Sequence, residues 1–157
     1  MILYHGTNID FQQIDLAKCR PHKDFGQGFY LTDIESQAQN MAIRRCEFSE
    51  EGFPVVQRYE FAQEVLLSPD IAVLSFESPS VEWARFVVQN RNRQTLMPHN
   101  YDIVIGPIAD DGVVFQINRY LEGFITIETL VSELRFKHLN NQYCFCTPLA
   151  ISHLHKL

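Results

Sequence analysis

The sequence lacks the features that mark membrane-spanning or secreted proteins. No run in it approaches the ~20 consecutive apolar residues that a membrane-spanning helix needs. Its opening residues, Met1-Ile2-Leu3-Tyr4-His5, carry no basic stretch and turn polar at once, unlike a signal peptide. Its four cysteines contain no C-x-x-C pair. We therefore expect a cytoplasmic protein without a membrane partner, whose cysteines are reduced thiols.

An excess of basic residues is also missing. The chain has 13 lysines and arginines against 19 aspartates and glutamates, a formal net charge of -6. That balance argues against non-specific binding to nucleic acid or to acidic membrane surfaces. Basic residues do gather at Arg44-Arg45 and at Arg91-Asn92-Arg93. Such clusters are typical of solvated surfaces, with a local binding patch as the alternative.

A metal site is not indicated by the cysteines and histidines. Cys144 and Cys146 lie two residues apart in a strand-like run, so both side chains should point to one face. Combining cysteines with His153 and His155 gives no recognised ligand spacing. We therefore expect no metal cofactor.

The hydrophobic pattern predicts one mixed α+β domain over residues 1–157. The chain has 157 residues, the size of one ordinary domain, and no linker rich in Gly, Pro or Ser divides it. Short apolar or alternating runs predict strands at 2–7, 28–32, 55–61, 71–76, 101–105 and 142–147. Helices are predicted after a capping box at 32–35, after Ser78-Pro79, and over 111–122, 126–137 and 148 to about 155.

The segment Asp24-Phe25-Gly26-Gln27-Gly28-Phe29-Tyr30-Leu31-Thr32 is the most distinctive in the chain. Two glycines predict a tight turn that leads into a short buried strand, where an aromatic side chain could wall a flat ligand. A plain hairpin turn is the alternative. A kinase D-F-G motif is excluded because too little chain precedes it, and G-x-G-x-x-G fails because position 31 is leucine and a strand follows.

Three separated segments, taken in order, resemble the signature strands of the ADP-ribosyltransferase superfamily. They are Leu3-Tyr4-His5-Gly6-Thr7, then Phe25 to Asp33, then Asn141-Gln142-Tyr143-Cys144-Phe145. The resemblance is to the branch with an H-Y-E triad, which includes poly(ADP-ribose) polymerases and diphtheria toxin, and to small bacterial proteins of this superfamily. It implies an ADP-ribosyltransferase-like fold, with split mixed and antiparallel sheets and flanking helices, and NAD as co-substrate.

By this resemblance the catalytic triad is His5, Tyr30 and Gln142. His5 would bond the adenosine ribose, and Tyr30 would line the nicotinamide pocket; a histidine that caps its own strand is the alternative for His5. Arg20 and Lys23 could neutralise the pyrophosphate, or could lie in a solvated loop. The residues that we expect to bind NAD are Gly6, Thr7, Arg20, Gly26, Gly28 and Met41.

The chain departs from the family pattern at two of these positions. Gln142 stands where the family has a catalytic glutamate, and Met41 stands where the polymerases have a stacking tyrosine. Loss of one preorganised electrostatic group typically costs ~100- to 1,000-fold in rate. Asp110 or Asp111 could supply a carboxylate instead, although helix capping is the simpler role for Asp111.

The activity that the resemblance implies is therefore mono-ADP-ribosylation. ADP-ribose would pass from NAD to an acceptor, with release of nicotinamide, and the acceptor could be a protein, a nucleic acid or a small molecule. An NAD- or ADP-ribose-binding module with weak or no chemistry is the first alternative. An unrelated α+β interaction protein is the second.

Overall fold

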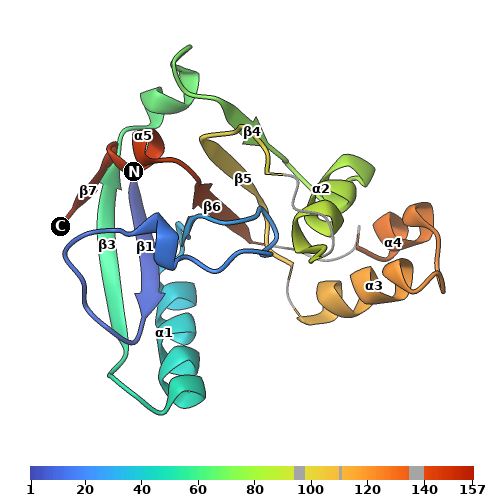
Figure 1. The fold of residues 1–157 in the computed structure, drawn as a ribbon, viewed down its shortest axis with the longest axis horizontal. Coiled ribbons are helices and arrows are strands. Elements are labelled where there is room, and N and C mark those ends of the chain that lie inside the picture. The colour runs from blue at the N-terminus through green and yellow to red at the C-terminus, as the bar shows by residue number, and fades with distance from the viewer. Residues whose placement is uncertain (94–97, 110, 135–139) are drawn as a thin grey trace.

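The chain folds into two β-sheets with flanking helices, as a computed structural model shows (Figure 1). The structure describes residues 1–93, 98–109, 111–134 and 140–157. The strands are β1 (Ile2–Thr7), β2 (Phe29–Leu31), β3 (Val55–Phe61), β4 (Val73–Ser75), β5 (Ile103–Pro107), β6 (Asn141–Phe145) and β7 (Leu154–Lys156). The helices are α1 (Glu35–Ser49), α2 (Val81–Arg91), α3 (Asp111–Leu121), α4 (Ile127–Leu134) and α5 (Pro148–Ile151), with 3-10 turns at Leu16–Lys18 and Gln63–Leu67. The predicted α+β class is confirmed.

The first sheet has the antiparallel order β1-β3-β7 and is covered by α1 (Figure 1). A glycine in β1 makes this close packing work. A Cβ built on Gly6 would lie 2.0 Å from the carbonyl oxygen of Ala38, so the backbones of β1 and α1 approach closely there. The facing residues of α1, Ala38 and Ala42, are also small and fully buried.

The second sheet is mixed, with the order β2-β6-β5-β4 and a parallel β4–β5 pair. In its register Tyr30 of β2 lies opposite Cys144 of β6. A single bridge joins the two sheets, because Tyr4 N donates to Thr32 O at 2.7 Å and Thr32 N donates to Tyr4 O at 3.0 Å. This bridge sets the end of β1 beside β2, and so His5 beside Tyr30.

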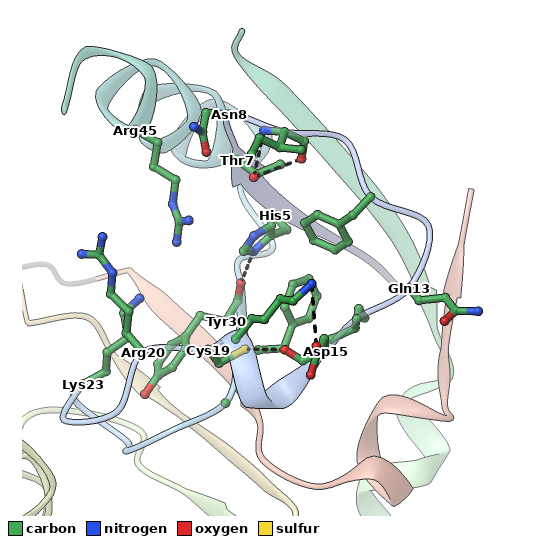
Figure 2. Close-up of a pocket in the computed structure, with 16 residues that line it drawn as sticks. His5, Thr7, Asn8, Gln13, Asp15, Cys19, Arg20, Lys23, Tyr30 and Arg45 are labelled. Carbon is green, nitrogen blue, oxygen red and sulfur yellow. Dashed lines mark hydrogen bonds and ion pairs between the residues drawn. The ribbon is translucent and has the colours of Figure 1, made fainter. Parts of the chain in front are cut away.

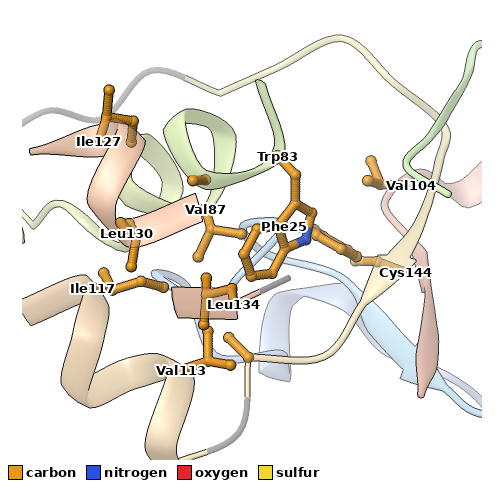
Figure 3. Close-up of a cluster of buried hydrophobic side chains, with 12 residues drawn as sticks. Phe25, Trp83, Val87, Val104, Val113, Ile117, Ile127, Leu130, Leu134 and Cys144 are labelled. Atoms are coloured by element: carbon orange, nitrogen blue, oxygen red, sulfur yellow. The ribbon is translucent and has the colours of Figure 1, made fainter. Parts of the chain in front are cut away.

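Two hydrophobic clusters hold these layers together. One joins residues of both sheets, namely Leu3, Phe29, Leu31, Tyr59, Phe61, Ile103, Ile105 and Phe145. The other packs the opposite face of the second sheet on α2, α3 and α4 (Figure 3), and includes Phe25, Trp83, Val87, Val104, Val113, Ile117, Leu130, Leu134 and Cys144. Because β5 contributes alternate residues to both clusters, it is buried on both faces.

The predicted starts of helices α1 and α2 were wrong in detail. The Thr32 hydroxyl accepts from Ile34 N and donates to Gln37 Oε1, so it shapes the turn before α1, and the N-cap residue Ile34 makes no side-chain cap. Helix α2 is capped by Ser80, whose hydroxyl accepts from Trp83 N at 3.1 Å, and not by Ser78-Pro79.

The C-terminal prediction was also wrong. The predicted helix from 148 to about 155 ends at Ile151, and Leu154–Lys156 pairs with β3 as a strand. Strands β1 and β3 have the predicted bounds.

The predicted helix end at 137 and Asp110 lie outside the described residues. Within the described chain, no helix combines the length and apolar character needed to cross a membrane.

Candidate functional site

A pocket of about 360 Å³ opens where β1, the loop after it, β2 and α1 meet (Figure 2). Its volume is within the usual range of small-molecule sites. We call it the His5 pocket. The predicted site residues that line it are His5, Thr7, Arg20, Gly28 and Tyr30. The predicted residues Gly6, Gly26, Met41 and Gln142 lie outside its lining.

His5 is held at the end of β1 as a neutral imidazole. Its Nδ1 lies 2.8 Å from the carbonyl oxygen of Tyr30, which can only accept, so Nδ1 carries the hydrogen. Burial is the largest cause that lowers the pKa of His5 to about 4, and the charges of Arg45 and Lys23 act in the same direction. At neutral pH the other ring nitrogen, Nε2, is therefore a hydrogen-bond acceptor. It suits a ligand hydroxyl.

Tyr30 lines the pocket, and its hydroxyl forms hydrogen bonds with the backbone of the glycine turn. The hydroxyl donates to Gly26 O at 2.8 Å and accepts from Phe25 N at 3.0 Å. Burial, followed by the nearby Cys144 thiol, raises the pKa of Tyr30, so the phenol stays protonated. The ammonium of Lys23 lies 4.7 Å from the ring centroid. Tyr30 can therefore act as a flat wall beneath a cation, but not as a free acid.

Three cations gather on the same side of His5: Arg20, Lys23 and Arg45 (Figure 2). None of them forms an ion pair with another residue that the structure describes. Burial lowers the pKa of Lys23, and repulsion by Arg45 lowers it further. Burial also lowers the pKa of Arg45, and repulsion by Arg20 adds to this effect. Arginine keeps its charge under such shifts. In a chain of net charge -6, this concentration of positive charge indicates an anion site.

Gly6 adds a backbone feature beside this site. Tyr4 directs its N–H and C=O away from β3 and toward Thr32. In an antiparallel strand the backbone groups of alternate residues point to the same side. Gly6 therefore directs its own N–H and C=O to that side, just past the bridge. A ligand carboxamide could pair with both groups.

The two glycines of the predicted turn have different roles. Gly26 has φ +80, and its carbonyl oxygen accepts a hydrogen bond from the Tyr30 hydroxyl. It lines a second cavity, separate from the His5 pocket. Gly28 lines the His5 pocket, and a Cβ there would lie 2.5 Å from Cys144 Sγ. Met41 is 48% exposed on α1. Neither Gly26 nor Met41 lines the His5 pocket.

Gln142 is tied to a buried carboxylate, Asp24. Gln142 Nε2 donates to Asp24 Oδ2 at 2.8 Å and more weakly to Pro107 O at 3.4 Å. Asp24 also accepts from Ala109 N at 3.1 Å, and its other oxygen accepts from Arg91 Nε at 2.7 Å. The carboxamide is therefore oriented by an ion pair behind it. Gln142 lies two residues from Cys144 on β6, on the face that Tyr30 also occupies.

The sequence interpretation missed three of these residues. Asp24 was considered only as part of a misleading D-F-G, and Arg91 as part of a solvated basic cluster, whereas the two form a largely buried ion pair. For Arg45 a solvated surface was favoured over a binding patch, yet it lines the His5 pocket. One usable signal was an aspartate directly before a glycine turn. The 67-residue separation of Asp24 and Arg91 left no local trace.

Carboxylates and metal ligands are sparse here. Asp15 lines the pocket, but it caps the turn Leu16–Lys18 and lies 3.9 Å from Lys18 Nζ. In the described ranges, no group of three or more His, Cys, Asp or Glu side chains is arranged to hold a metal ion. The pocket as described is suited to an anionic ligand that carries hydroxyls and a flat ring.

Comparison with known proteins gives a family without an activity. A family model described as "Protein of unknown function (DUF3990)" matches residues 1–156. No curated protein and no solved structure matches the chain.

Proposed function

The chain belongs to the DUF3990 family, and we propose that it binds NAD in the His5 pocket and transfers ADP-ribose from NAD to an acceptor, releasing nicotinamide. The observation that carries this proposal is the meeting of a neutral His5, the Tyr30 ring and three cations around one pocket. Its fold would be the ADP-ribosyltransferase fold implied by the three sequence segments.

The pyrophosphate, a ribose and the nicotinamide of NAD each have a chemical match in or beside the pocket. The pyrophosphate is a dianion, and Arg20, Lys23 and Arg45 offer three cations for it. His5 Nε2 accepts a hydrogen bond from a ribose hydroxyl, because Nδ1 is already committed to Tyr30 O. The flat nicotinamide packs on the Tyr30 ring once the Lys23 ammonium moves from that ring to the pyrophosphate. Its carboxamide pairs with the backbone of Gly6.

In the proposed reaction the bond between ribose C1′ and the nicotinamide nitrogen breaks, and the acceptor attacks C1′ and loses a proton. Positive charge develops on the ribose, and negative or dipolar groups stabilise it. Gln142 contributes a dipole in place of the catalytic glutamate of the ADP-ribosyltransferases that the chain resembles. Because its Nε2–H donates to Asp24, the carboxamide is polarised and Oε1 carries more negative charge. A slow mono-transferase is the activity that this arrangement fits.

A second function, NAD binding without turnover, is favoured by one specific observation. Gln142 lies outside the lining of the His5 pocket, and its Nε2 is held by Asp24 and Pro107. In this alternative the pocket recognises NAD or ADP-ribose, and Gln142 only fixes the strand end.

Calorimetric titration with NAD and a nicotinamide-release assay separate these functions. Binding with release, and transfer of labelled ADP-ribose to a component of a cell lysate, supports the transferase. Binding without either supports the module. Arg45→Gln should weaken NAD binding about tenfold, the effect of ~1.4 kcal/mol from one lost cation–phosphate contact. Arg44→Gln is the matched control, because Arg44 is exposed and does not line the pocket.

Absence of NAD binding in the wild-type protein would refute both functions. Equal loss of affinity in Arg44→Gln and Arg45→Gln would refute the placement of the anion in the His5 pocket, because only a general charge effect would then remain.

A further inference from the structure

A pair of thiols lies at the end of β6, and one of them lines a second cavity. Cys144 Sγ and Cys146 Sγ are 3.4 Å apart. Cys144 is fully buried, and Cys146 is partly buried and lines a cavity of about 350 Å³. Among the described residues, Asn90, His99, Tyr101 and Thr147 also line this cavity. We call it the Cys146 pocket.

The two sulfurs have different access and different acidity. Either thiol can donate in the Sγ–Sγ contact, and this hydrogen bond with Cys144, followed by the effect of His99, lowers the pKa of Cys146. Burial raises the pKa of Cys144. A thiolate is the nucleophilic form of cysteine. Cys146 is thus the thiol that can react with a molecule in the cavity, and Cys144 is the protonated partner behind it.

The surrounding residues keep this pair in place. His99 is fixed by Phe25 O, 2.9 Å from its Nε2, and by Tyr101 N, which donates to its Nδ1 at 3.2 Å. Cys146 N donates to Asp102 O at 2.8 Å, which anchors the end of β6 to β5. Asp102 opposes the Cys146 thiolate by repulsion, but this effect is smaller than the effects of Cys144 and His99 that lower the pKa of Cys146, and Asp102 does not line the cavity.

We propose that Cys146 and Cys144 form a thiol–disulfide exchange site that takes a low-molecular-weight disulfide in the Cys146 pocket. The Cys146 thiolate attacks one sulfur of the disulfide RSSR, forms a mixed disulfide, and releases RS⁻, which takes up a proton. Cys144 then gives up its proton and attacks Cys146 Sγ, releasing the second RSH. The two cysteines lose two electrons and two protons, and RSSR is reduced to two RSH. The sulfurs must close from 3.4 Å to the ~2.05 Å of a disulfide bond.

The test uses glutathione disulfide as the probe and intact-mass measurement as the readout. In a Cys19→Ser/Cys46→Ser background only the pair remains. This protein should lose two hydrogens, reversibly on reduction. Adding Cys144→Ser should trap one glutathionyl group on Cys146, and adding Cys146→Ser instead should leave the protein unmodified. Far-UV circular dichroism of each variant checks its fold.

Labelling of the wild-type protein with iodoacetamide tests the same order without any substitution. Cys146 should be alkylated at least about tenfold faster than Cys19, which is partly buried and has its pKa raised by burial. The proposal is overturned if the background protein keeps both thiols, if Cys144→Ser traps no adduct, or if Cys19 is alkylated as fast as Cys146.

Discussion

The variant Gln142→Glu puts a second carboxylate beside Asp24 and tests the arrangement behind the proposed site. Glutamate is nearly isosteric with glutamine, so the change alters charge and donor capacity more than shape. Gln142 Nε2 donates to Asp24 Oδ2 at 2.8 Å in the native chain. After the substitution two acceptors face each other at this distance, and Arg91 can compensate only one of them, since it binds Asp24 Oδ1.

The magnitude follows from that geometry. At an effective dielectric constant of about 20, two unit charges at the 2.8 Å of this contact repel by ~6 kcal/mol. The lost hydrogen bond to a charged group adds ~1.5–3 kcal/mol. Rotation of the new side chain and its protonation relieve most of this. We expect the free energy of unfolding to fall by about 2–4 kcal/mol at pH 7.

The loss should depend on pH in a defined direction. The neighbouring Asp24 raises the folded-state pKa of the introduced glutamate above its unfolded value of ~4.3. The unfolded state then binds fewer protons than the folded state between these two pKa values. The difference from wild type should therefore be small below about pH 4.3 and grow with pH until it levels off above the folded-state pKa.

Urea unfolding followed by circular dichroism measures these differences. Gln89→Glu is the matched control, because it makes the same charge change at an exposed position of α2. The double variant Asp24→Asn/Gln142→Glu exchanges the carboxylate and the carboxamide and restores one hydrogen bond between them. It should be at least about 1.5 kcal/mol more stable than the sum of the two single losses predicts. It is also the appropriate protein for asking whether a glutamate here increases nicotinamide release.

The contact between Asp24 and Gln142 is refuted if the free energies of unfolding of Gln142→Glu and Gln89→Glu agree within about 0.5 kcal/mol at pH 7, or if the losses of the two single variants Asp24→Asn and Gln142→Glu simply add. Either result would mean that Asp24 and Gln142 do not interact in solution. The carboxamide would then be free to turn toward the His5 pocket, and the polarised role proposed for it would lose its basis.

Three further predictions concern the frame around the site. Gly6→Ala should lower the free energy of unfolding by at least about 2 kcal/mol in urea unfolding, because its Cβ would lie 2.0 Å from Ala38 O; a loss under 1 kcal/mol would contradict the close packing. Ser80→Ala should lower the free energy of unfolding by ~1 kcal/mol in the same assay, because α2 loses its N-cap, whereas Ser78→Ala should change it very little. The reverse order would show that Ser78 caps the helix, as the sequence predicted. In an NMR titration the His5 ring should stay neutral until the pH falls to about 4; a midpoint near 6.5 would show that it is not buried.

Local periodicity and turn chemistry determined much of the fold. Alternation in Val55–Phe61 is a short-range property, and the observed strand has the predicted bounds. The glycine turn before Tyr30 was also predicted from residue type, and Gly26 indeed has φ +80. The order of the three resembling segments suggested that His5 and Tyr30 would meet, and they are joined by a 2.8 Å hydrogen bond. Neighbouring residues carry the information on the strand and the turn, whereas the meeting of His5 and Tyr30 was inferred from the resemblance of separated segments.

Only the tertiary structure decided which charged groups are partners. Arg91 and Asp24 are 67 positions apart, and their ion pair depends on α2 packing behind the glycine turn. Arg45 reaches the His5 pocket, while Arg44 beside it faces solvent, because packing of α1 on β1 fixes the rotation of the helix. The pairing of Leu154–Lys156 with β3 likewise arises from a chain reversal that no local pattern announces. Contacts of this kind depend on how elements pack, so the sequence pointed to His5 and Tyr30 but not to Arg45 in the pocket or to the ion pair that holds Gln142.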